Sequence, residues 1–358
     1  MNKVFKVVFN AVRNKMMVVN EMTSSMQVGR KKARVAMVVG ATILAFSGAG
    51  YAAVELINIS PIGDKGNWVI PDSYNFYTAG SEPNNNKVLF NEEFSTQEVN
   101  LYGYKGGLTA GFSNSSNNSQ NNSFTIKSGS FINLFITGGY SAISNAQENS
   151  VSISGGSIKA SQLAGGLSET ESATKNIVTI SGGNVDIDLL VGGISFGSGS
   201  VTGNQVSVST GVFGEIDGGY SSSGSITDNK VTINNATVES VYGGQSGSGS
   251  SVKNKVSISN STVGTVYGGY SYFGSSEGNT VIFNSGTYTD IEVYGGKTEG
   301  DYVEHGNANG NTVVITGTTK VLSGGGEYMS LIYGGYSCWG SANNNVITIE
   351  GGEVKPAP

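Results

Sequence analysis

A five-residue motif that recurs along most of the chain is the feature that most constrains its fold. Each copy begins with Asn and places apolar residues at its third and fifth positions, and a Gly-Gly pair follows nearly every copy, the copies being 25 to 34 residues apart. They begin at Asn122, Asn149, Asn176, Asn204, Asn229, Asn254, Asn279, Asn311 and Asn345, with a weaker copy at Asn86. Such regular self-similarity predicts about ten units of one repeat array over residues 86–358.

Each unit contains two apolar segments. The first alternates, as in Val256-Ser257-Ile258, which is the pattern of a strand with one buried face. In the second segment Val263 and Val266 are three residues apart, so we expect the strand to bend between them. Turn residues separate the segments. We expect the Gly-Gly pair to form a corner at positive φ, which glycine adopts more readily than other residues.

One unit cannot be stable alone. Its roughly five apolar side chains contribute about 1.5–3 kcal/mol each when fully buried, whereas ordering the unit costs about 1.5 kcal/mol per residue. Stacking removes this deficit, because each strand can pair in parallel with its counterpart about 4.8 Å away in the next unit. The sequence therefore predicts an all-β parallel β-helix (β-solenoid) of about ten coils, with almost no helix after residue 53. An antiparallel propeller or sandwich fits less well, because the alternating strands are short and the Asn register is strict.

Stacked coils place identical residues above one another. We therefore expect the repeated asparagines to form a structural ladder of side-chain amides, and certain tyrosines to stack in a row. The tyrosines at the matching position are Tyr242, Tyr267, Tyr294 and Tyr333. Extra residues at 300–310 and 322–330 fit loops that leave the stack intact. Residues 53–85 do not match the motif, and we predict that they cap the open edge of the first coil.

The segment before the array carries an export signal. Residues 29–52 contain a basic stretch around Arg30 and Arg34, then the apolar run 35–46, then the small residues Gly50 and Ala52. This order is typical of a Sec signal peptide cleaved after Ala52. An apolar run of this length is shorter than the roughly 20 residues that a membrane-spanning helix needs.

Residues 1–28 form a leader that an ordinary signal peptide does not need, and we expect it to be helical or disordered. The leader contains Met1-Asn2-Lys3, the segment 5–10 and the segment 18–21. In these segments it resembles the extended signal peptide region of type V secreted proteins, the autotransporters and two-partner exoproteins of Gram-negative-type bacteria. The family usually has Trp where this chain has Phe9.

The resemblance implies export through the Sec translocon and then through an outer-membrane β-barrel translocator, to the cell surface or the medium. It also implies a C-terminal barrel domain, which residues 53–358 do not contain. The resemblance implies nothing about the activity of the exported part.

Composition and single residues argue against several kinds of chemistry. Residues 1–52 carry a net charge of +7 and the remainder −13, so nucleic acid is not expected as a partner. The only histidine, His305, lies in a polar segment without a nucleophile motif, and we interpret it as an exposed loop residue. The only cysteine, Cys338, has no partner for a disulfide, and we expect a half-buried structural thiol.

Two pairs of carboxyls raise the question of an enzyme that cleaves polysaccharides. Asp186 and Asp188 are two residues apart on one strand, as are Glu215 and Asp217, and glycoside hydrolysis uses two carboxyls about 5 to 9.5 Å apart. We interpret both pairs as outward, solvated side chains, because they form no patch with basic residues over neighbouring coils. Residues 243–249 resemble a calcium-binding nonapeptide repeat but lack its Asp, so no catalytic residue, metal or cofactor is predicted.

Three functions remain open on the sequence. The first is a non-enzymatic, adhesin-like autotransporter passenger, secreted or displayed on the cell surface, that contacts a host glycan or a matrix protein. The second is a secreted β-helix enzyme acting on polysaccharide. The third is a two-partner exoprotein, which ranks lower because its usual N-terminal secretion motif is missing from residues 53–120. We predict the first and expect no enzymatic activity.

Overall fold

The computed structural model describes residues 5–10, 15–20, 57–58, 67–68, 76–78, 83–90, 95–96, 107–301, 303–323 and 330–355. The predicted signal peptide 29–52, including its cleavage site at Ala52, lies outside these residues. The chain divides into two compact units, residues 1–54 and 55–358. Each is described below by itself.

In the first unit, β1 (Phe5–Asn10) and β2 (Lys15–Asn20) pair antiparallel, with Phe5 opposite Asn20. The expectation of a helical or disordered leader is therefore wrong for these segments. Both are rich in Val and other residues that favour strands, and a four-residue connection suits a hairpin.

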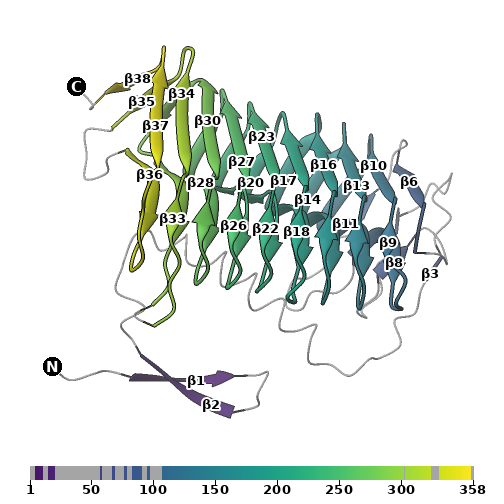
Figure 1. Ribbon diagram of the computed structural model, residues 1–358. Coiled ribbons are helices and arrows are strands. Elements are labelled where there is room, and N and C mark those ends of the chain that lie inside the picture. Colours follow the sequence, from purple (N-terminus) through teal and green to yellow (C-terminus); the bar gives the residue numbers. More distant parts are fainter. Residues whose placement is uncertain are drawn as a thin grey trace. The chain divides into compact units, whose positions relative to one another are not determined.

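The second unit is built from parallel sheets whose strands come from successive repeats (Figure 1). The first sheet contains the strand that follows each motif Asn. Its strands are β6 (Lys87–Phe90), β10 (Ser123–Ile126), β13 (Ser150–Ile153), β16 (Ile177–Ile180), β19 (Gln205–Val208), β23 (Lys230–Asn234), β27 (Lys255–Ser259), β30 (Thr280–Ser285), β34 (Thr312–Thr316) and β37 (Val346–Glu350).

The second sheet contains the strands that carry or flank the Gly-Gly pairs. They are β8 (Gly107–Ser113), β11 (Ser130–Ser141), β14 (Ser157–Ser168), β17 (Asn184–Ser195), β20 (Val212–Asp217), β21 (Tyr220–Ser221), β24 (Thr237–Tyr242), β25 (Gln245–Ser246), β28 (Thr262–Ser271), β32 (Glu292–Thr298) and β36 (Leu331–Ser337). Short strands from the segment predicted to be a cap pair with this sheet. They are β3 (Ile57–Asn58), β4 (Asn67–Trp68) and β5 (Phe76–Thr78), with β7 (Ser95–Thr96) beside β4.

The third sheet consists of two-residue strands that close each turn. They are β9 (Ser119–Gln120), β12 (Ala146–Gln147), β15 (Ala173–Thr174), β18 (Val201–Thr202), β22 (Ile226–Thr227), β26 (Ser251–Val252), β29 (Ser276–Glu277) and β33 (Ala308–Asn309). A small additional sheet joins β31 (Thr287–Thr289), β35 (Lys320–Leu322) and β38 (Glu353–Lys355).

Equivalent residues pair from turn to turn, which confirms the predicted parallel β-solenoid. Val231 lies opposite Val256, which in turn lies opposite Val281. No helix occurs in the part of the chain that the structure describes. Among the described residues the first sheet has ten strands and the third has eight, so the complete turns seen there are fewer than the ten units inferred from the motif spacing.

The apolar core lies between the first sheet and the first part of each second-sheet strand. Val256 and Ile258 contribute to it from β27, and Val263 and Val266 from β28, all at most 5% exposed. Val263 and Val266 both reach the core although they are three residues apart, because the pairing skips Gly264. The expected bend in this segment is therefore present.

Candidate binding surface

The motif asparagines form a hydrogen-bonded column inside the solenoid. The backbone N–H of each one from Asn122 to Asn311 donates to the side-chain oxygen of the asparagine one turn later, at 2.8–3.1 Å. The side-chain nitrogen donates to that same oxygen at 2.9–3.1 Å. The nitrogen of Asn229 also donates to the carbonyl of Val201, 3.0 Å away. Each interior amide is thus satisfied on both sides, which compensates for its burial.

The Gly-Gly pairs make room for this column. A Cβ on Gly139 would lie 2.4 Å from Cγ of Asn149, and one on Gly138 would lie 2.6 Å from the carbonyl oxygen of Gly165 in the next turn. These contacts leave no space for a side chain. The expectation that these pairs supply positive φ is wrong, because none of the eight repeat pairs from Gly138-Gly139 to Gly334-Gly335 adopts it.

Positive φ occurs instead at the residue just before each ladder asparagine. Glu148, Lys175 and Lys253 have φ values of 54–55° there, and Gly203, Gly278 and Gly310 occupy the same position in other turns. The corner of each turn therefore lies between the third sheet and the ladder asparagine. The conformation is costly for Lys and Glu, but the neighbouring turns impose it.

The second-sheet strands bend at the Gly-Gly pair and bring together two columns of side chains that are not part of the main apolar core, although many of them are buried. We call these two columns the bend surface. The column before the pairs contains Thr137, Ala164, Val191, Asp217, Tyr242, Tyr267, Tyr294 and Tyr333. The column after the pairs contains Tyr140, Leu167, Ile194, Tyr220, Gln245, Tyr270, Lys297 and Tyr336.

Ring contacts across the pair show the bend directly. Tyr267 and Tyr270 flank Gly268 and Gly269, yet their rings meet edge to face with centroids 5.6 Å apart. Tyr242 meets Tyr270 of the next turn in the same way, at 5.8 Å. In a straight strand, residues three apart point to opposite faces, so the strand must turn at the glycines.

Four tyrosines in the first column stack face to face from turn to turn. The centroids of Tyr242 and Tyr267 are 4.6 Å apart, and the row continues through Tyr294 to Tyr333 with spacings of 5.2 and 5.1 Å. Lys297 lies beside this row, with its Nζ 5.1 Å from the ring centre of Tyr294 and 3.0 Å from a carboxylate oxygen of Glu299. The row thus combines aromatic stacking with a cation over the rings.

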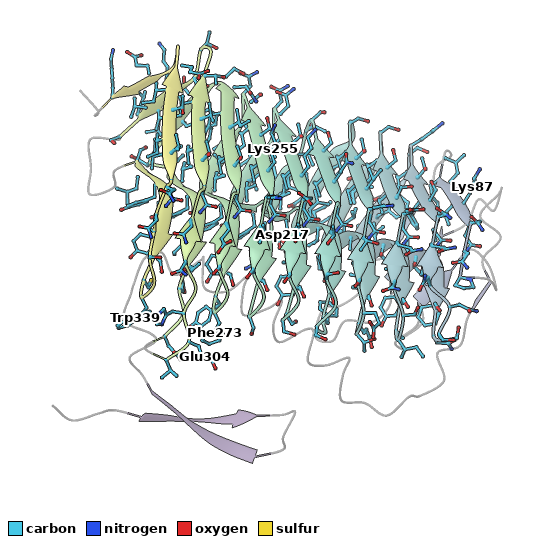
Figure 2. The ribbon with its side chains drawn as sticks, viewed as in Figure 1. Lys87, Asp217, Lys255, Phe273, Glu304 and Trp339 are labelled. Carbon is cyan, nitrogen blue, oxygen red and sulfur yellow. The ribbon has the colours of Figure 1, made fainter. Side chains whose placement is uncertain are left out.

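A pair of buried carboxyls lies where the aliphatic part of the first column meets the tyrosines. Glu215 is 7% exposed and Asp217 is fully buried, so the expectation that they are solvated is wrong. With its amide nitrogen oriented toward them, Gln245 donates to Glu215 Oε1 at 3.2 Å and to Asp217 Oδ2 at 3.1 Å. The other oxygen of Asp217 is buried and has no hydrogen-bond partner among the described residues. Figure 2 shows Asp217 midway along the stack of turns.

Burial dominates the electrostatics of this pair. It raises the pKa of Glu215 to about 7. It also raises the pKa of Asp217 well above the usual range, and the neighbouring charge of Glu215 raises it further. A carboxyl that is taken out of water favours its neutral form. Both groups therefore retain protons at pH values where exposed carboxyls are ionised.

The repeat register explains why sequence reasoning missed these residues. Asp217 pairs with Val191 on one side and with Tyr242 on the other. It directly precedes Gly218-Gly219, the position that a tyrosine occupies in later turns. That alignment was visible in the sequence, but the burial of the position was not.

The other candidate residues are dispersed. Asp186, Asp188 and His305 are exposed, as interpreted from the sequence. Cys338 is exposed as well, so the expected half-buried thiol is wrong; it follows β36 in an outer loop rather than pointing into the core. Among the residues that the structure describes, no three His, Cys, Asp or Glu side chains gather as metal ligands.

Comparisons with known proteins identify the leader. Residues 1–50 match the family model described as Extended Signal Peptide of Type V secretion system. No curated protein matches the chain, and no solved structure does. Within the described ranges, no helix is both long and apolar enough to span a membrane. An export leader of type V secretion followed by a parallel β-solenoid fits an autotransporter passenger.

Proposed function

We propose that this passenger is a non-enzymatic, adhesin-like protein that is secreted or held at the cell surface and contacts a host glycan or matrix protein. The observation that carries the proposal is the tyrosine row of the bend surface, which spans four turns from Tyr242 to Tyr333. Tyrosine is enriched at recognition surfaces because its rigid ring offers a large contact area and its hydroxyl bonds to a partner. The parallel sheets hold the row in place.

The burial of the two carboxyls supports binding rather than hydrolysis. A glycosidase brings both of its carboxyls into contact with the sugar at the scissile bond. Here Glu215 is only 7% exposed and Asp217 is fully buried, so a sugar could not contact Asp217 without displacing its neighbours.

The alternative is a secreted enzyme acting on polysaccharide. One observation favours it, since Gln245 lies within hydrogen-bond distance of both carboxyls and so holds them close together. A hydrolase with this pair would release reducing ends, and Glu215→Gln would abolish the release. The two functions therefore make different predictions for the same protein.

The test is an adhesion assay on purified protein. The protein is applied to surfaces coated with fibronectin, collagen, laminin or mucin, and bound protein is measured at increasing concentration. Parallel incubations with soluble polysaccharides are assayed for reducing ends. Saturable binding without release of reducing ends is the expected result. Absence of binding to every coated surface, or release that depends on Glu215, would overturn the proposal.

A further inference from the structure

The tyrosine-bearing half of the bend surface presents mainly neutral hydrogen-bonding groups to solvent. Tyr220, Tyr242, Gln245 and Tyr270 are all partly exposed there, whereas the aliphatic residues Leu167 and Ile194 of the same column are buried. A tyrosine hydroxyl both donates and accepts hydrogen bonds, as the two ends of a glutamine amide do together. These groups match a ligand that is rich in hydroxyls.

The charges in this region disfavour an anionic ligand. Lys297 is paired with Glu299 at 3.0 Å and lies over the rings of Tyr267, Tyr294 and Tyr336. Glu292 and Glu299 lie near enough to interact electrostatically with Tyr294. An anionic ligand would have to be desolvated without gaining a free counter-charge, which is unfavourable. A neutral ligand avoids that cost.

The buried carboxyls have a positioning role toward Gln245. Its amide nitrogen lies between Glu215 Oε1 and Asp217 Oδ2, at 3.2 and 3.1 Å. With the nitrogen directed inward, the amide oxygen remains as an acceptor on the outer side. The carboxyls themselves are too deeply buried to be the contact surface.

The groups recur once per turn. Tyr220, Gln245 and Tyr270 occupy equivalent positions in three successive turns, so their polar groups return once per turn along the solenoid. Such a series suits a ligand that is itself a repeating chain, because each added repeat gains similar contacts and the total affinity rises with length.

We propose that the surface formed by Tyr220, Tyr242, Gln245 and Tyr270 binds a neutral polysaccharide whose chain runs along the stack of turns. The tyrosine and glutamine groups bond to sugar hydroxyls, and the ring edges cover the less polar faces of the sugars. This inference rests on the proposed function and gives it a ligand class and a site.

The test measures binding of dextran, yeast mannan and laminarin to the purified 358-residue protein by affinity electrophoresis, with heparin as an anionic polymer for comparison. The variant Tyr242→Phe/Tyr270→Phe removes two hydroxyls and keeps the rings. Tyr272→Phe is the matched control, since it removes a hydroxyl from an exposed ring that packs on Phe273 outside the bend surface. Gln245→Met removes the amide at similar size. Circular dichroism establishes that each variant keeps its β structure.

At least one neutral polysaccharide is expected to bind, and more tightly as its chain lengthens. The double tyrosine variant should weaken binding about tenfold, as expected for the loss of two neutral hydrogen bonds, and Gln245→Met should also weaken it, while Tyr272→Phe leaves it unchanged. Equal affinity of the double variant and the control would place the site elsewhere. Binding of heparin alone would refute the neutral ligand. If no polysaccharide binds while adhesion to a matrix protein persists, this inference fails and the proposed function stands; loss of all adhesion would remove both.

Discussion

The buried carboxyl pair should make the stability of the solenoid fall as pH rises. Glu215 has a pKa of about 7 in the folded protein against an ordinary value of 4.5. The folded state therefore holds this proton more tightly than the unfolded state does. Its stabilising effect is complete below about pH 4.5, is lost progressively up to about pH 7, and stays lost at higher pH. Asp217 shifts in the same direction and extends the loss to higher pH.

The size of the effect follows from the shift in pKa. One pKa unit corresponds to about 1.4 kcal/mol, so the shift at Glu215 amounts to about 3 kcal/mol between pH 4.5 and 7. The double variant Glu215→Gln/Asp217→Asn removes both titrating groups and keeps similar shapes. It should remove this slope and should be more stable than the natural protein at pH 8 by about 3 kcal/mol or more.

Repeat proteins need not unfold in a single step, so the assay should be local. Hydrogen exchange of the amides in β20 and β21 reports the opening free energy of this turn at each pH. Asp186→Asn is the matched control, because Asp186 is an exposed carboxyl in the preceding turn, opposite Val212. It should retain the slope of the natural protein. The reasoning would be refuted if these amides in the natural protein lost no protection from exchange between pH 5 and 7.5. It would also be refuted if the double variant kept the same slope of opening free energy against pH.

Three further predictions concern the solenoid itself. Asn229→Ala removes the acceptor of two bonds from Asn204 and the donor to Val201. It should lower the opening free energy of its turn, measured by hydrogen exchange, by about 3–5 kcal/mol, whereas Asn234→Ala on the strand surface should cost under about 1 kcal/mol. Gly269→Ala should cost more than about 3 kcal/mol, because its Cβ would lie 2.3 Å from the side chain of Asn279. Gly310→Ala has open space but a φ of 65°, so it should cost only about 1–2 kcal/mol. Equal costs for the two variants would contradict the close-approach argument. Lys253→Gly relieves a φ of 54° and should raise the opening free energy of its turn by about 0.5–1 kcal/mol in the same exchange measurement, so a decrease would show that the corner is not strained.

The repeat register determined much of this fold from sequence alone. A motif with Asn at a fixed place, followed by alternating apolar residues such as Val256 and Ile258, has few ways to bury its apolar side chains. Parallel stacking buries them and satisfies the asparagine amides together, which is why the class of fold followed from spacing. The leader was equally readable, because an export signal is recognised as a linear segment rather than as a folded surface.

The bend at the glycines was decided only in three dimensions. The Gly-Gly pairs looked like corners because glycine adopts positive φ, but they are required by the close approach of Gly139 to Asn149 and of each pair to the next turn. Glu215 and Asp217 are buried beside Gln245 of the next turn, whereas a single strand would leave them in water. Burial depends on residues about one turn away in the chain, and the two-residue spacing of these carboxyls carries no information about that neighbourhood.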